Sequence, residues 1–187
     1  MTVLHTLWLP IVASAILVFL ASWILHVLLP WHKHDRKKVP DQDRVMDALR
    51  PFNLAAGDYM LPGCDSMAEM KSPEFQEKMK RGPVLTATVR GGPPNMGRSL
   101  FVWFVYCLVV TYIAAYVGAH ALALVRPFPL HGHARRLIGL AAFAGYGLSQ
   151  WQDTIWFGRS LGTSVRNTID AIIYALITAA VFGWLAP

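Results

Sequence analysis

Four long apolar stretches alternate with polar segments along the chain. They cover residues 7–29, 100–125, 137–157 and 169–185. About 20 consecutive apolar residues cross the hydrocarbon core of a bilayer as an α-helix. The third stretch ends in polar residues at Gln150, Gln152 and Asp153, so its last third must face protein or water. The pattern predicts an all-α integral membrane protein with about four transmembrane helices.

The polar segment between the first two stretches has the pattern of a small α+β insert. Ser72, followed by Pro73 and Glu74, is typical of a helix start, and Gly82 is typical of a helix end. A second short helix is expected from Asp41 to Arg50, and residues 58–61 and 84–89 are expected to form strands. A two-stranded sheet is marginal alone and needs a cover. We therefore divide the chain into a first transmembrane helix (1–30), an insert (31–98) and a three-helix transmembrane region (99–187).

The distribution of charged residues predicts how the chain is oriented in the membrane. The chain is 55% hydrophobic and carries a formal net charge of +6, but its basic residues flank apolar stretches, as in membrane proteins, and do not indicate nucleic-acid binding. Lys33, Arg36, Lys37 and Lys38 directly follow the first stretch, and no Lys or Arg precedes it. The positive-inside rule predicts an outer N-terminus and a cytoplasmic insert, although Arg126, Arg135 and Arg136 oppose this orientation.

The seven histidines raise the question of a haem or metal site. His26 and His120 lie in different spans, but they are expected near opposite membrane faces, too far apart to share one haem. His120, His131 and His133 are weak metal candidates on the outer side, near His5, with no Cys or carboxylate beside them. His32 and His34 lie in a basic run, where headgroup contact is expected. The sequence therefore predicts no cofactor and no metal.

Asp153 is the acid expected nearest to membrane depth, and such a group is costly unless it is paired. Arg159 would lie on the other side of a continuous helix, so Arg166 or a basic group of the insert is at least as plausible, and we predict an inter-helix ion pair. The alternative is a proton or cation relay through Asp153, Gln150, Tyr146 and Asp170.

Small residues recur at every fourth position of two stretches, in Ala171, Ala175, Ala179 and Gly183 and again in Ala141, Gly145 and Ser149. Such stripes allow helix backbones to approach closely. They predict packed helix interfaces, either within the chain or with another chain.

Three segments resemble a group of small bacterial inner-membrane proteins to which no activity is assigned. They are Trp8–Pro10, Gln152–Arg159 (Gln-Asp-x-Ile-Trp-Phe-Gly-Arg) and Tyr174–Ala179 (Tyr-Ala-Leu-x-Thr-Ala). The resemblance extends to Gly82, Pro83 and the 91–97 turn, and it implies a multi-pass protein of the bacterial inner (plasma) membrane.

No acid–base or metal set of an enzyme is evident in the sequence. The leading hypothesis is a non-catalytic accessory or scaffold subunit, whose partners are the lipid bilayer and other membrane protein subunits. The alternatives are a small transporter or ion-conducting protein that uses Asp153, and a membrane enzyme that acts on lipid or quinone.

Overall fold

The computed structural model describes residues 3–124 and 130–185, with the side chains of all of these except residues 3, 4, 122–124, 130, 131 and 133. The chain divides into two compact units. The first, a helical bundle, contains the chain up to Lys37 and again from Asn95, and the second, the insert, is Lys38–Pro94. Residues 31–37, expected in the insert, thus belong to the bundle, because they contact its last helix.

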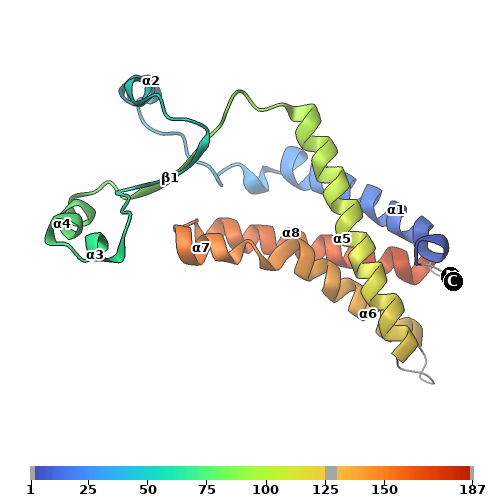
Figure 1. Cartoon of the computed structure of the whole chain (residues 1–187). Helices are drawn as coiled ribbons and strands as arrows, with labels where there is room; N and C mark the ends of the chain where they lie inside the picture. Colours follow the sequence, from blue (N-terminus) through green and yellow to red (C-terminus); the bar gives the residue numbers. More distant parts are fainter. Residues whose placement is uncertain (1–2, 125–129, 186–187) are drawn as a thin grey trace. The chain divides into compact units, whose positions relative to one another are not determined.

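In the described part of the chain, four long helical segments build the bundle (Figure 1). They are α1 (Val3–Trp23), α5 (Met96–Leu124), α6 (Leu130–Phe143) and α8 (Leu161–Leu185). Helix α1 packs against α5 and α8, and α6 packs against the same two helices. The four therefore enclose a common core, in the order α1–α5–α6–α8.

Short irregular turns extend two of these helices. After α1 the chain forms a π-helical turn η1 (Ile24–Leu28) and a 3-10 turn η2 (Pro30–His32). After α6 it forms a π-helical turn η4 (Ala144–Leu148) and the short helix α7 (Trp151–Phe157), which ends at Gly158 with a φ of 68°. The expected third span at 137–157 is therefore interrupted.

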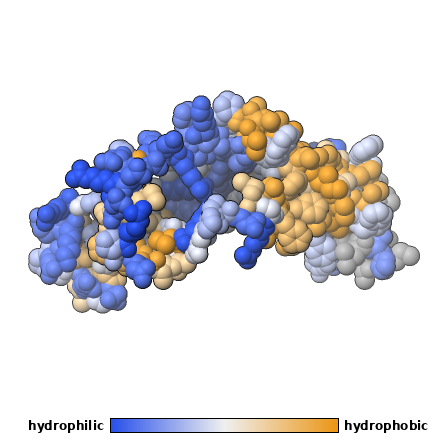
Figure 2. All heavy atoms as spheres, turned by 90° about the horizontal axis from the view of Figure 1, so that it is seen from above, coloured by the Kyte–Doolittle hydropathy of each residue, from blue (hydrophilic) through white to orange (hydrophobic). Residues whose placement is uncertain are grey.

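Within the described residues, three helical segments are long and apolar enough to cross a membrane, namely His5–Leu28, Met96–Ala121 and Leu161–Leu185. Their outward surfaces are rich in exposed large apolar side chains, and Figure 2 shows hydrophobic surface on the bundle and mainly hydrophilic surface on the insert. These features are consistent with a membrane protein of predominantly helical structure.

The small-residue stripe on α8 packs inside the chain, whereas Ser149 of the other expected stripe is exposed. A Cβ added at Gly147 would lie 2.8 Å from the Ala171 Cβ, and one at Gly139 would lie 3.2 Å from the Ala179 Cβ. One at Gly145 would lie 2.8 Å from Val110 of α5. The stripe on α8 thus faces α6 and η4 of the same chain. The sequence left open whether the small residues pack within the chain or against another chain, and these contacts are within the chain.

The insert contains α2 (Gln42–Leu49), η3 (Arg50–Phe52), β1 (Gly57–Leu61), α3 (Met67–Met70), α4 (Pro73–Arg81) and β2 (Leu85–Val89). The strands pair antiparallel, with Tyr59 opposite Ala87. Ser72 caps α4 as expected, since its Oγ accepts from the Phe75 backbone N–H. Asp41 precedes α2 but makes no side-chain cap, because its backbone is left-handed, with a φ of 49°. Helix α3 was not expected from the sequence.

Candidate functional site: a histidine–aspartate cluster beside a cavity

The end of α1 brings two histidines face to face. Leu29 is extended and Pro30 begins the next turn, so the backbone folds back between His26 and His32. Their rings stack with centroids 4.2 Å apart and planes inclined by 4°. The orientation of the His26 ring is also fixed by a hydrogen bond, since its Nδ1 lies 3.0 Å from the Ser22 carbonyl oxygen.

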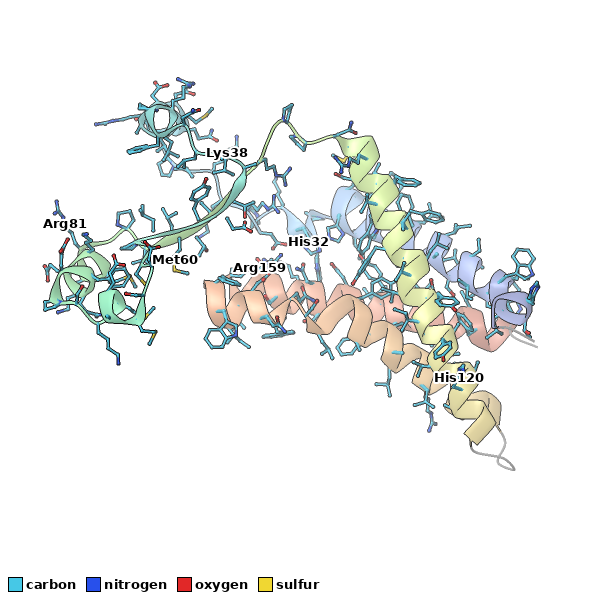
Figure 3. The ribbon with its side chains drawn as sticks, viewed as in Figure 1. His32, Lys38, Met60, Arg81, His120 and Arg159 are labelled. Carbon is cyan, nitrogen blue, oxygen red and sulfur yellow. The ribbon has the colours of Figure 1, made fainter. Side chains whose placement is uncertain are left out.

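His32 lies between two carboxylates. Its Nδ1 is 2.6 Å from Asp35 Oδ2, and its Nε2 is 2.8 Å from Oδ2 of Asp170, a residue of α8. The same Asp170 oxygen is 3.8 Å from His26 Nε2. Arg166, one turn before Asp170, donates to Asp35 Oδ1 through Nε at 2.7 Å. We call His26, His32, Asp35, Arg166 and Asp170 the histidine–aspartate cluster (Figure 3 labels His32).

The hydrogen bonds of His32 fix how many protons the cluster holds. Carboxylates only accept hydrogen bonds, and a neutral imidazole has only one N–H. Two carboxylates on one ring therefore require either a doubly protonated His32 or a proton on one of the two acids. With His32 protonated, His32 and Arg166 balance Asp35 and Asp170, and the cluster is neutral overall.

Asp35 follows the 3-10 turn η2, beyond the end of the first apolar helical segment. Burial raises the pKa of its carboxyl group, but hydrogen bonds and charges from His32 and Arg166 outweigh burial and lower the pKa below its ordinary value of 3.8. Thr163 also donates to Asp35 Oδ1, at 3.3 Å. Asp35 is therefore ionised near neutral pH and ties the end of η2 to the start of α8.

A cavity of about 430 Å³ opens beside the cluster. Its wall is mainly apolar and aromatic, and six of the lining residues carry polar groups: Ser22, His26, Gln150, Asn167, Asp170 and Tyr174. The remaining lining residues are Phe19, Trp23, Val27, Met96, Leu100, Trp103 and Tyr146. Trp103 is fixed in the wall because its Nε1 donates to Ser22 Oγ at 2.8 Å.

In the part of the chain that the structure describes, three cavity residues each have a buried polar atom without a hydrogen-bond partner: Asp170 Oδ1, Tyr174 OH and Gln150 Nε2. Gln150 reaches the cavity because the helix is broken between η4 and α7. A buried polar atom without a partner costs on the order of 1–3 kcal/mol. Three residues that line the cavity therefore have unused hydrogen-bonding capacity.

Metal binding is the first chemistry to test against this geometry. His26, His32 and Asp170 each offer a ligand atom, and the three atoms lie within 4.8 Å of one another. A metal such as zinc lies near the plane of each imidazole, about 2.0–2.1 Å from its nitrogen. An ion between two nearly parallel stacked rings would lie out of both planes. The rings would have to turn before they could share an ion, so the arrangement fits hydrogen bonding better.

The histidine expectations are partly wrong. The His32 side chain is only 9% exposed and contacts two acids, so it does not face headgroups in a basic run; the neighbouring positive charges are offset by Asp35 and Asp170. His34 is exposed, as expected. Among the weak metal candidates, His120 is exposed, its Nδ1 lies 2.9 Å from the Tyr116 carbonyl oxygen, and His131 and His133 lie outside the described side chains.

His26 and His120 are far apart, in agreement with the rejection of a shared haem. Leu100 lines the cavity with His26, and His120 lies a further 20 residues along α5, which is about 30 Å of helix. Figure 3 places His32 and His120 toward opposite ends of the bundle.

Asp153 forms an ion pair with Arg159, one of the partners left open, but the expectation that this pair joins two helices is wrong. Asp153 contacts Arg159, at 3.4 Å, with the two side chains 52% and 37% exposed. The left-handed Gly158 ends α7 and turns the chain back, so Arg159 reaches Asp153 without a continuous helix. Arg166 pairs with Asp35 instead. Of the four residues of the suggested relay, Gln150, Tyr146 and Asp170 line the cavity and Asp153 does not.

Sequence reasoning missed the cluster because its members come from distant segments. His32 and Asp170 are separated by 138 positions, and no local pattern predicts such a contact. Two signals were present: Asp170 is an acid in an otherwise apolar stretch, and Asp35 is the one acid within the 33–38 basic run.

Comparison with known proteins gives no match: no family model, no curated protein and no solved structure matches this chain. The resemblance to a group of bacterial inner-membrane proteins therefore stays a prediction.

Proposed function

We propose that this chain is a multi-pass membrane protein that binds a neutral ring-bearing lipid, such as a quinol, in the cavity beside the histidine–aspartate cluster. One observation carries the proposal: among the described residues, Asp170, Tyr174 and Gln150 line a mainly apolar cavity, and each has a buried polar atom (Oδ1, OH and Nε2) without a hydrogen-bond partner. A ligand with an apolar body and a polar head would satisfy these atoms and fill the space.

The hydrogen-bonding atoms limit the head group. Asp170 Oδ1 accepts, Gln150 Nε2 donates, and the Tyr174 hydroxyl does either. The head must therefore both donate and accept, as a ring hydroxyl does. Because the cluster balances its own charges, a neutral head is favoured over an ammonium or a phosphate.

The wall and the volume favour a ring over a plain acyl chain. Trp103, Tyr146 and Tyr174 form an aromatic group, with centroid separations of 5.4–6.3 Å between them. Aromatic faces stack favourably on a planar ring. A volume of about 430 Å³ lies within the range of small-molecule sites.

The proposed setting is the bacterial inner membrane, with the N-terminus outside and the insert in the cytoplasm. The basic run Lys33–Lys38 after α1 supports this orientation. We further propose that α6, η4 and α7 together form a fourth membrane segment, since Tyr146 and Gln150, at their interruption, line the cavity.

The test is binding of a short-chain benzoquinol to the purified full chain in nanodiscs, measured by calorimetry under reducing conditions. Gln150→Leu or Tyr174→Phe removes one hydrogen bond and should weaken binding about tenfold, as expected for a loss of about 1.4 kcal/mol. The matched control is Tyr112→Phe, since Tyr112 is exposed and does not line the cavity. Binding that is absent in the parent chain, or equal in all variants, would overturn the proposal.

A second candidate function is that of an accessory subunit of a larger membrane complex, and one observation favours it. Both strands of the insert sheet are largely exposed on both faces, and an uncovered two-stranded sheet is marginal, so a partner protein that covers it is proposed. Native mass spectrometry after gentle extraction tests this: a defined hetero-complex supports it, and a lone stable monomer contradicts it. The small-residue stripe no longer supports it, because it packs internally.

A further inference from the structure

A groove of about 490 Å³ runs between α6 and α8, away from the histidine–aspartate cluster. The residues that line it are Arg135, Arg136, Gly139, Leu140, Phe143, Ile172, Ala175, Leu176 and Ala179. Apart from the two arginines, these side chains are apolar. The groove therefore has an apolar body with a cationic end.

The floor of the groove is formed by small residues. Gly139 packs so closely on Ala179 that an added Cβ would lie 3.2 Å from the Ala179 Cβ. Leu140 and Leu176 also line the groove and are 63% and 64% exposed. A groove lined by small residues and exposed leucines fits an alkyl chain.

The cationic end lies near the far end of α8. The Arg135 stem crosses α8 at Gly183, where an added Cβ would lie 2.8 Å from Arg135 Cδ. Gly183 is 13 residues beyond Asp170 in α8, or about 20 Å. These arginines thus lie toward the outer face in the proposed orientation, where the positive-inside rule disfavours them.

Neither arginine has an ion pair or hydrogen bond among the described residues. Two arginines that are consecutive in sequence, have no partner among the described residues and line an otherwise apolar groove are complementary to an anion that carries alkyl chains. Arginine binds phosphate oxygens through paired N–H donors.

We propose that this groove binds an anionic glycerophospholipid, with its phosphate on Arg135 and Arg136 and an acyl chain along Gly139, Leu140 and Leu176. A zwitterionic lipid would bring an ammonium group toward two positive charges, so a headgroup without an amine is preferred. This lipid site rests on the proposed function only in that the chain lies in a membrane. The groove and the quinol cavity are separate sites with different lining residues.

The experiment is native mass spectrometry of the delipidated full chain, titrated with phosphatidylglycerol or with phosphatidylethanolamine of the same acyl chains. The parent chain should bind phosphatidylglycerol at least fivefold better. Arg135→Gln with Arg136→Gln should reduce this preference to near onefold. The control removes two exposed charges of the insert, by Arg81→Gln with Arg90→Gln, and should keep the preference.

A second variant tests the groove without changing charge. Leu176→Trp fills the apolar part and should weaken binding of both lipids at least threefold, while both arginines remain. No preference in the parent chain, or an equal loss in the arginine and control variants, would overturn the proposal. Quinol binding should be unchanged in all of these variants, so the failure of one site does not decide the other.

Discussion

At the residue scale, the contact between His32 and Asp170 joins two segments of the bundle through almost fully buried groups, with side chains 9% and 4% exposed. Removing one partner of a buried charged pair leaves the other without compensation, which costs more than the pair itself contributes. We expect Asp170→Asn and His32→Gln each to destabilise the chain, and a double-mutant cycle of detergent unfolding to give a coupling of about 2 kcal/mol.

The exposed pair of Asp153 and Arg159 is the matched comparison. Surface ion pairs contribute little, so Asp153→Asn with Arg159→Gln should give a coupling below about 0.5 kcal/mol. Equal couplings for the two pairs would show that His32 and Asp170 do not form the buried contact described here.

The carboxyl group of Asp35 should make the stability of the folded chain depend on pH. Its pKa is lowered in the folded chain, so its ionised form stabilises folding above the ordinary value, and this contribution is lost as the pH falls through the lowered pKa. The advantage of the parent chain over Asp35→Asn in apparent unfolding temperature should be constant from pH 7 to about pH 5 and shrink below about pH 4. An advantage that grows on acidification would contradict this sign. Asp153→Asn is the control and should follow the parent curve.

Residue patterns predicted local features better than the site. Ser72 and Gly82 bounded a helix through short-range capping, and the spacing of Ala171, Ala175 and Ala179 predicted a packed face. The role of His32 depended instead on a carboxylate from the other end of the sequence. Its neighbours Lys33, Arg36 and Lys37 suggested an exposed basic segment, since the compensating Asp170 is distant in sequence.

At the element scale, the interrupted segment α6–η4–α7 depends on glycine for its approach to α8. Gly147 lies in η4, and a Cβ there would meet the Ala171 Cβ at 2.8 Å, a methyl group on a helix that cannot rotate away. Gly147→Ala should therefore destabilise the chain by about 1–3 kcal/mol, measured by detergent unfolding.

The same substitution in open space provides the control. An added Cβ at Gly132, in α6, meets nothing within 4 Å. Gly132→Ala should be neutral or stabilise by up to about 1 kcal/mol, because alanine favours helix more than glycine does. Destabilisation of similar size in both variants would contradict a packing origin.

At the scale of the whole molecule, the contacts make α1 and α8 antiparallel. Residues at the end of α1 contact the start of α8 through Asp35 and Arg166, whereas Ile11 and Phe182 share a core cluster near the other end. If both helices cross a membrane, residues 31–37 and the turn before α8 lie on one face, and the start of α1 lies on the other.

Cysteine labelling from each side of the membrane tests this arrangement. Cys64 of the insert is partly exposed and Cys107 is buried, so an impermeant maleimide should label only Cys64 in the parent chain. In a Cys64→Ser background, Ser160→Cys should be labelled from the same side as Cys64, and His5→Cys from the opposite side, because an antiparallel pair of spanning helices places their near ends together. Labelling of positions 5 and 160 from one side would mean that α1 does not span, and the cavity beside Asp170 would then not lie at membrane depth.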